Sequence, residues 1–193
     1  MSLVSLSLLL VVSLQAGALE PQRLFEAGEP WEHYLDRVDR QRELWLRTSA
    51  VATVSPELVE RVRRAGQDLQ LLVVAEDWCP DSAYSVPYVA RLAALAQVPI
   101  RIVDRATGES LMRAHRTTDG RTATPTVVLL RQGADVGAWV ERPAVLQELF
   151  RSIGTSPESA RRFAQRGEWY EADRGVTVLK EIVALVEQTG EAK

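Results

Sequence analysis

The stretch LQLLVVAEDWCPDS, residues 69–82, joins an apolar segment to the only cysteine of the chain. Residues 69–75 form a near-continuous apolar run containing β-branched side chains, which predicts a central parallel strand covered on both faces. From Pro80 to Ala96 the apolar residues recur at helical spacing, and Pro87 is expected to kink that helix. The strand is therefore followed by a helix, and Cys79 stands where that helix begins.

Helical patterns precede this stretch. Four apolar side chains share one helical face and predict an amphipathic first helix: Trp31, Leu35, Val38 and Trp45. The tripeptide Ser-Pro-Glu at 55–57 predicts the capped start of a second helix, which should end at Gly66.

Strand and helix patterns alternate after it. Strand patterns occupy 99–104, 126–130 and 136–140, the last two in a hairpin through Gln132-Gly133, and helical patterns occupy 109–115, 143–153, 157–165 and 176–187. This order predicts an α/β fold with a central mixed sheet and helices on both faces. The core should span about 69–153, with extra helices at both termini, over 29–66 and 157–188. Functional residues of such sheets lie at the carboxyl ends of strands, where Cys79 stands.

Length and charge limit the class of protein. The chain has 193 residues, enough for one ordinary domain with a full core, so we take residues 19–193 as a single domain. A net charge of −3 leaves no basic face large enough to neutralise phosphates, so nucleic acid is not expected as a partner. One cysteine with His33 and His115 cannot supply a structural zinc set, so no metal is expected.

The first eighteen residues form a separate segment. Residues 1–18 carry no charged side chain, run apolar from Leu3 to Leu14 and end in Ala16-Gly17-Ala18, a pattern that signal peptidase accepts. The apolar run is too short for a membrane span of about 20 residues. We therefore expect an exported protein, periplasmic or extracellular, cleaved after Ala18. The alternatives are an uncleaved anchor, which would bring contact with the membrane, and a start codon assigned too far upstream in a cytoplasmic protein.

Several features in fixed order resemble the thioredoxin family. They are an apolar strand, Trp78-Cys79-Pro80-Asp81-Ser82, Pro87 and Ala123-Thr124-Pro125, and they cover roughly 69–153. In that family the cysteine follows a tryptophan, opens a helix and precedes a kinking proline by the same interval. A second proline, cis in the family, packs against the reactive sulfur, and Pro125 stands in its place. The flanks LFEAG at 24–28, EDWC at 76–79 and WYEADRG at 169–175 look like a bacterial subgroup of thioredoxin-like proteins.

The chain departs from the family at two positions. Ser82 stands where a thioredoxin has its second cysteine, so no internal disulfide can form. Monothiol glutaredoxin-like proteins also have serine there and complete exchange with an external thiol, so the resemblance implies glutathione or another low-molecular-weight thiol as co-substrate and no other cofactor. Val73 replaces the buried aspartate that moves protons in thioredoxins, which leaves Glu76 and Asp77 as candidates for proton transfer.

Two local effects act on the Cys79 sulfur in opposite directions. The start of a helix, with its free N–H groups and positive dipole end, favours the thiolate, and Ser82 can add a hydroxyl donor. Glu76, Asp77 and Asp81 place negative charge nearby, which disfavours ionisation. Each effect is worth on the order of 1 kcal/mol or less when exposed, so the sequence leaves the sign of their sum open.

Two functions of different classes fit these residues. One is a monothiol thiol–disulfide oxidoreductase, in which Cys79 and Ser82 react with a protein or small-molecule disulfide. Its partner would be held by Trp78, Pro80, Thr124 and Pro125. The other is a non-catalytic module that captures extended peptides in the groove at Trp78 and Thr124-Pro125, the sulfur being incidental. A third, a peroxide-reducing thiol, has little support because the sequence ties no arginine to Cys79.

Overall fold

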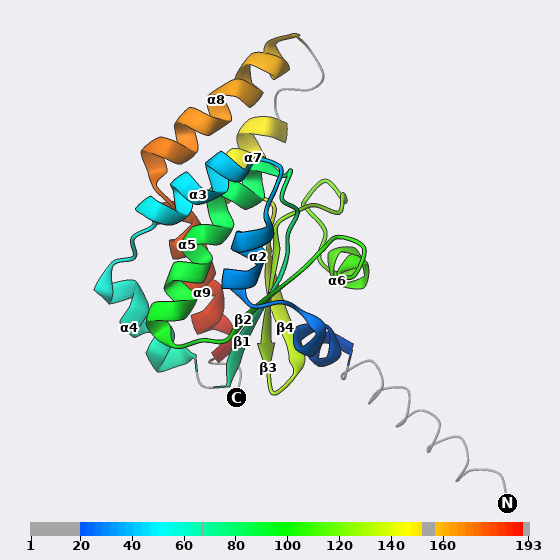
Figure 1. Cartoon of the computed structure of the whole chain (residues 1–193), viewed down its shortest axis with the longest axis vertical. Coiled ribbons are helices and arrows are strands. Elements are labelled where there is room, and N and C mark those ends of the chain that lie inside the picture. Colours follow the sequence, from blue (N-terminus) through cyan, green and yellow to red (C-terminus); the bar gives the residue numbers. More distant parts are fainter. Residues whose placement is uncertain (1–19, 67, 152–156, 191–193) are drawn as a thin grey trace, which may run out of the picture.

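A four-stranded mixed sheet forms the centre of the molecule (Figure 1). The computed structural model describes residues 20–66, 68–151 and 157–190, with side chains outside 151–164. Within these residues the strand order is β2-β1-β3-β4, and the strands are β1 (Leu69–Val74), β2 (Ile100–Val103), β3 (Thr126–Arg131) and β4 (Ala134–Val140). Strand β1 is parallel to β2 and antiparallel to β3, and β3 forms the predicted hairpin with β4. The mixed sheet is confirmed, although β1 has a parallel neighbour on one side only.

Helices cover both faces of this sheet. The helices are α2 (Trp31–Arg37), α3 (Arg42–Val51), α4 (Pro56–Ala65), α5 (Pro80–Ala96), α6 (Glu109–Ala114), α7 (Ala144–Arg151), α8 (Pro157–Asp173) and α9 (Val176–Gly190). Residues 20–27 are also helical. Figure 1 shows α3, α4, α5 and α9 on one side of the sheet, and α6 with the helix at 20–27 on the other. The predicted α/β architecture with helices at both termini is therefore confirmed.

The alternation of side chains along β1 divides the core in two. Leu71 and Val73 enter the larger cluster, which α5 and α9 share, whereas Leu72 and Val74 enter a smaller cluster with Phe25 and α6. All four strand side chains are at most 2% exposed. Because a fully buried Leu or Val side chain contributes about 1.5–3 kcal/mol, β1 helps to hold both helical layers to the sheet, as does β3 with the same alternation.

The N-terminal apolar pattern belongs to two helices, so the expected first helix was wrong. Helix α2 ends at Arg37, the backbone turns with Gln41 in the left-handed region at φ 52°, and α3 begins at Arg42. The break is stabilised because the Asp77 carboxylate accepts hydrogen bonds from the Asp39 and Arg40 N–H groups, at 3.2 and 3.0 Å. The tryptophan and tyrosine rings on either side still meet in one core, with the Trp31 and Trp45 centroids 6.1 Å apart.

The other helix boundaries agree with expectation except in the C-terminal region. Ser55 caps α4 by accepting from the Leu58 N–H at 3.4 Å, and Pro87 lies inside α5. Helix α8 was expected to stop near Gln165 but continues to Asp173. Gly167 lies inside this helix and permits close packing, because a Cβ there would lie 2.9 Å from the Tyr84 hydroxyl oxygen.

Two sequence expectations fall partly or wholly outside the described residues. The expected helix at 143–153 is observed as α7, and its last two residues are not described. The signal peptide expected at 1–18 also lies outside them. Among the helices that are described, none is long and apolar enough to cross a membrane.

We predict that Gly175→Ala lowers the free energy of unfolding by more than about 2 kcal/mol. Gly175 has φ +73°, and a Cβ there would lie 2.3 Å from Tyr88 Cγ, so alanine adds a steric clash to the left-handed strain. Gly120→Ala is the matched control, because Gly120 has φ +82° with nothing within 4 Å of the added Cβ. The control should cost about 1–2 kcal/mol in urea unfolding, and equal costs for the two variants would contradict the packing argument.

Candidate functional site

Cys79 occupies the N-cap position of α5, at the carboxyl end of the central strand β1. Its carbonyl accepts the Ala83 N–H at 3.0 Å, and its own N–H donates to the Glu76 carbonyl at 3.1 Å. The β conformation of Cys79, followed by Pro80 at the first helical position, is a standard helix start. The turn from β1 into α5 therefore fixes the sulfur at a helix N-terminus, and the residue as a whole is only 6% exposed.

The Thr124–Pro125 segment lies against this sulfur. The Thr124–Pro125 peptide bond is cis. The Cys79 thiol donates to the Thr124 carbonyl oxygen, with sulfur and oxygen 3.2 Å apart. Because a thiolate has no hydrogen to donate, this contact belongs to the protonated form of Cys79. The structure thus brings together two sequence-predicted residues that are 45 positions apart.

The remaining residues of the motif differ in accessibility. Trp78 is 44% exposed, which is unusual for a tryptophan beside a buried residue. Ser82 is fully buried on α5, and within the described part of the chain its hydroxyl has no hydrogen-bond partner. The motif therefore presents an aromatic ring to solvent while its sulfur and hydroxyl lie beneath the surface.

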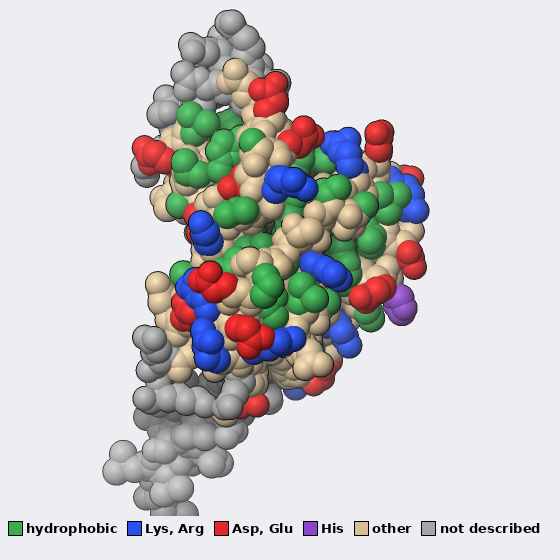
Figure 2. All heavy atoms as spheres, turned by 90° about the vertical axis from the view of Figure 1, so that its left-hand side faces the viewer, with side chains coloured by type: hydrophobic (Ala, Val, Ile, Leu, Met, Phe, Trp, Pro, Cys, Tyr) green, Lys and Arg blue, Asp and Glu red, His purple; other side chains and the backbone are tan. Residues whose placement is uncertain are grey.

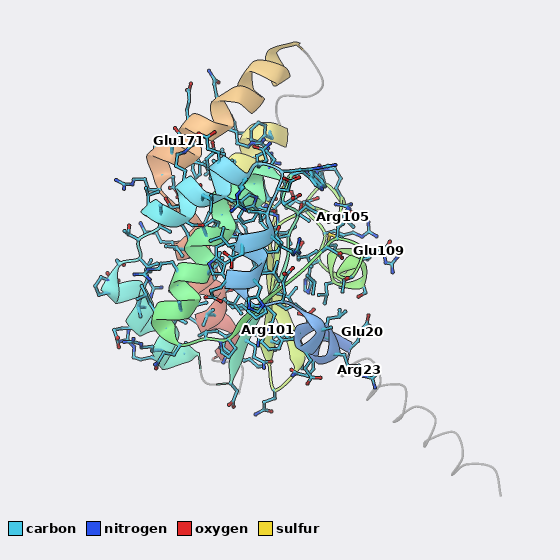
Figure 3. All side chains as sticks on the ribbon, in the orientation of Figure 1. Glu20, Arg23, Arg101, Arg105, Glu109 and Glu171 are labelled. Atoms are coloured by element: carbon cyan, nitrogen blue, oxygen red, sulfur yellow. The ribbon has the colours of Figure 1, made fainter. Side chains whose placement is uncertain are left out.

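Glu76 and Asp77 are half-buried and bonded to neighbouring loops. The Glu76 carboxylate accepts the Arg105 N–H at 2.8 Å, and the Arg105 guanidinium donates to the Thr122 hydroxyl at 2.9 Å. Arg105 lies on the α6 side of the sheet, where Figure 3 labels it. Asp77 caps the break between α2 and α3, and its carbonyl accepts the Trp45 indole N–H at 2.9 Å. Both carboxylates hold backbone in place close to Cys79.

Asp81 is the centre of a buried ionic cluster that the sequence did not predict. Its carboxylate, 4% exposed, accepts from Arg142 at 3.0 Å, from Arg166 at 2.8 Å and from the Tyr170 hydroxyl at 2.9 Å. The sequence predicts Asp81 only as a negative charge near the thiol, whereas in the structure that charge is paired with two arginines. The two guanidinium groups that face it lie 61 and 85 residues further along the chain.

Burial and pairing act in opposite directions on Asp81. Burial raises the pKa of the Asp81 carboxyl, while the charges of Arg142 and Arg166 and the Tyr170 hydrogen bond lower it. Burial also raises the pKa of Tyr170. The Asp81 carboxylate accepts from three donors, so removing it would break its buried ion pairs with both arginines.

The ionic cluster continues to the Thr124–Pro125 segment through the loop after β4. Arg142 also contacts the buried Glu141 carboxylate at 2.8 Å, and Glu141 binds Arg121 at 3.2 Å. The Glu141 N–H donates to the Pro125 carbonyl at 2.7 Å. Buried hydrogen bonds and ion pairs thus link the first turn of α5, α8 and the strand that follows the cis peptide.

Sequence reasoning found the thiol, the proline and the tryptophan but missed Arg142, Arg166 and Tyr170. The one available signal was the WYEADRG flank, which contains Tyr170 and was taken only as a family likeness. Among the described residues, no group of three or more His, Cys, Asp or Glu side chains is placed to hold a metal ion.

Comparison with known proteins agrees with this geometry. A thioredoxin family model matches residues 28–160, which is more than half of the chain. The chain therefore belongs to the thioredoxin family. No curated protein sequence matches it.

Two solved structures are similar in fold. A Pseudomonas aeruginosa protein of unknown function has a TM-score of 0.66 and 20% identity, covering 86% of this chain and 95% of that one. An HIV epitope scaffold has a TM-score of 0.65 and 19% identity, covering 86% of this chain and 97% of that one. At this identity the two structures establish the fold alone, and the chemistry has to be argued from the residues of this chain.

We predict that Asp81→Ala lowers the free energy of unfolding by about 3–5 kcal/mol, the cost of removing one partner from a buried ion pair. Glu109→Ala is the matched control, because Glu109 also pairs with an arginine, at 3.0 Å, but with a 61% exposed side chain. It should cost about 0.5 kcal/mol or less. Urea unfolding at neutral pH measures both, and similar costs would mean that the cluster contributes no more than a surface pair.

Proposed function

We propose that this protein carries out monothiol thiol–disulfide exchange through Cys79, with an external thiol completing the cycle. The observation that carries the proposal is the 3.2 Å contact between the Cys79 sulfur and the carbonyl before Pro125, at the N-terminus of α5. This contact joins the thiol to the Thr124–Pro125 segment, which we take to pair with an extended partner, next to the exposed ring of Trp78.

In the first step, the Cys79 thiol loses its proton and the thiolate attacks one sulfur of a partner disulfide. The partner S–S bond breaks, a mixed disulfide forms with Cys79, and the other partner sulfur leaves as a thiolate that takes up a proton. The departing thiol proton passes to solvent or to Glu76 or Asp77, the carboxylates that precede the motif. Ser82, whose hydroxyl has no partner among the described residues, supplies a hydrogen bond to the thiolate.

In the second step, an external thiolate attacks the mixed disulfide and releases Cys79. The chain has a single cysteine, so Ser82 cannot perform this step. With glutathione or a similar thiol, two thiols are oxidised to one disulfide while the partner disulfide is reduced to two thiols, and Cys79 is regenerated. Trp78, Pro80, Thr124 and Pro125 bind the partner during exchange.

The compartment in which the protein works decides which external thiol can release Cys79 from the mixed disulfide. If residues 1–18 are removed on export, the protein works in an oxidising environment and needs a dedicated reductant, whereas a cytoplasmic protein has glutathione available. The N-terminal sequence of the mature protein in its own host distinguishes the two, because cleavage after Ala18 would leave Leu19 as the first residue.

We predict that oxidised glutathione forms a mixed disulfide with the reduced, folded chain faster than with the same chain unfolded in urea. The folded site supplies the helix N-terminus and the Thr124–Pro125 segment beside the sulfur, both of which the unfolded chain lacks. Mass spectrometry at timed intervals measures the reaction, and Cys79→Ser is the control that must show none. Equal rates in the two states would reject the proposal.

A second function is favoured by one observation. Cys79 is 6% exposed whereas the adjacent Trp78 is 44% exposed, so the accessible part of the motif is the aromatic ring rather than the sulfur. A reactive thiol is generally partly exposed. The alternative is therefore a non-catalytic module that binds extended peptides at Trp78 and Thr124-Pro125.

The two functions differ in what Cys79→Ser does. With a peptide selected on the wild-type chain from a phage-displayed library, the binding module predicts that Cys79→Ser retains affinity, whereas Trp78→Ala loses about tenfold or more, as at an interface hot spot. Val145→Ala, at another exposed apolar residue, is the matched control. Loss of affinity in Cys79→Ser with retention in Trp78→Ala would reject the binding module.

A further inference from the structure

Ionisation changes which groups the Cys79 sulfur can bond. In the structure the thiol donates its hydrogen to the Thr124 carbonyl oxygen, 3.2 Å from the sulfur. An ionised sulfur has no hydrogen to donate, and at this distance a thiolate and a carbonyl oxygen are two acceptors that repel each other. The protonated and the ionised sulfur therefore need different partners.

The first turn of α5 offers donors to the ionised sulfur. Cys79 is the N-cap residue of α5, and its side chain makes no capping bond to this turn. Among the residues that the structure describes, the N–H groups of Asp81 and Ser82 have no hydrogen-bond acceptor. These are the N–H groups that the side chain of an N-cap residue ordinarily reaches. The turn is therefore able to bind the sulfur once it carries a negative charge.

The Ser82 hydroxyl adds a further donor. Ser82 is the third helical residue of α5, and a side chain at that position lies on the same side of the helix as the N-cap side chain. It is fully buried, and its hydroxyl has no partner within the described part of the chain. Buried hydroxyl groups are rarely left without a partner, and a thiolate at the N-cap would provide one.

The Thr124 carbonyl depends on the thiol in return. Thr124 is 5% exposed, and of the described residues only Cys79 donates to its carbonyl oxygen. When the sulfur turns toward α5, this buried acceptor is left without a donor. The backbone N–H of an extended partner can then take the place of the thiol hydrogen.

The charged groups that surround the motif are bonded to other residues. They are Glu76, Asp77, Asp81, Arg105, Asp119, Arg121, Glu141, Arg142 and Arg166. Figure 2 looks onto the side of the molecule where α3 and α4 lie, and acidic and basic side chains are interspersed there, so this face adds no field of one sign. The position of the sulfur is therefore decided by its own proton and by the donors of α5.

From these contacts we infer that Cys79 is a two-position switch. Protonated, its sulfur binds the Thr124 carbonyl; ionised, with the proton released to solvent, it turns to the Ser82 hydroxyl and the free N–H groups of α5. Because this turn leaves the carbonyl for a partner, partner binding and thiol ionisation favour each other. The inference rests on the proposed function in taking the Thr124–Pro125 segment as the place where a partner pairs.

Two single-site NMR signals test the switch in the full chain. The chain has one cysteine and one Thr-Pro pair, so ¹³Cβ-cysteine, and ¹³C′-threonine combined with ¹⁵N-proline, each give one signal. Between pH 6 and pH 10, conditions set by the experiment, the Thr124 carbonyl signal should move with the same midpoint as the Cys79 signal. A carbonyl signal that does not move would overturn the switch. So would one that still titrates in Cys79→Ala, because another group such as His33 or His115 would then be its cause.

The variant Ser82→Ala tests the donor. It should raise the midpoint of both signals by about one pH unit, because the thiolate loses a charge-assisted hydrogen bond. Ser49→Ala is the matched control, because the Ser49 hydroxyl donates to the Trp45 carbonyl at 2.7 Å on α3, and it should leave the midpoint unchanged. An unchanged midpoint in Ser82→Ala would overturn the role of Ser82.

Binding of S-methylglutathione, whose blocked sulfur cannot exchange, tests the coupling to a partner. At the acid end of the titration Cys79→Ala should bind this probe about fivefold more tightly than the wild-type chain, because its Thr124 carbonyl has no donor. Cys79→Ser, whose hydroxyl can still donate to that carbonyl, should bind as the wild-type chain does. Equal affinity of the two variants, or no saturable binding, would overturn the coupling. The exchange reaction is measured separately with oxidised glutathione, so failure of one proposal is distinguishable from failure of the other.

Discussion

The antiparallel pairing of β1 with β3 is the constraint on which the candidate site depends. In this register Val74, the last residue of β1, lies opposite Thr126, the first residue of β3. The segment leaving β1 and the segment entering β3 therefore emerge at the same edge of the sheet. Cys79 follows one and Thr124 precedes the other, which is why a thiol and a carbonyl so distant in sequence come within 3.2 Å.

Ion pairs with residues outside the sheet also hold the segment Trp78–Ser82 in place. Asp81 lies two residues after the cysteine and binds arginines from the loop after β4 and from α8, so the helix that carries the sulfur is tied to the C-terminal region. Buried ion pairs of this kind add little net stability against an apolar substitute, but breaking one is costly. Their effect here is to fix where α8 sits relative to the thiol.

The N-terminal and C-terminal helices pack against the region around Cys79 from two sides. Asp77 stabilises the break between α2 and α3, and the Trp45 indole bonds to the Asp77 carbonyl, so the residues just before the cysteine hold the N-terminal helices in place. Gly167 lets α8 approach Tyr84 on α5. The turn around Cys79 is thus held by contacts with both ends of the chain, while Trp78 remains 44% exposed.

The sequence alone determined what depends on local pattern. The apolar run of β1 and the Cys-Pro helix start could be predicted because burial and capping leave signals within a few residues, and the position of Pro125 followed from the family likeness. The break between α2 and α3 could not, because apolar residues on both sides of a corner can keep helical spacing and the groups that stabilise the turn come from Asp77. Only the tertiary structure paired Asp81 with Arg142 and Arg166. Such contacts depend on the three-dimensional docking of α8, and a charged residue in a sequence carries no mark that distinguishes a solvated side chain from a buried one.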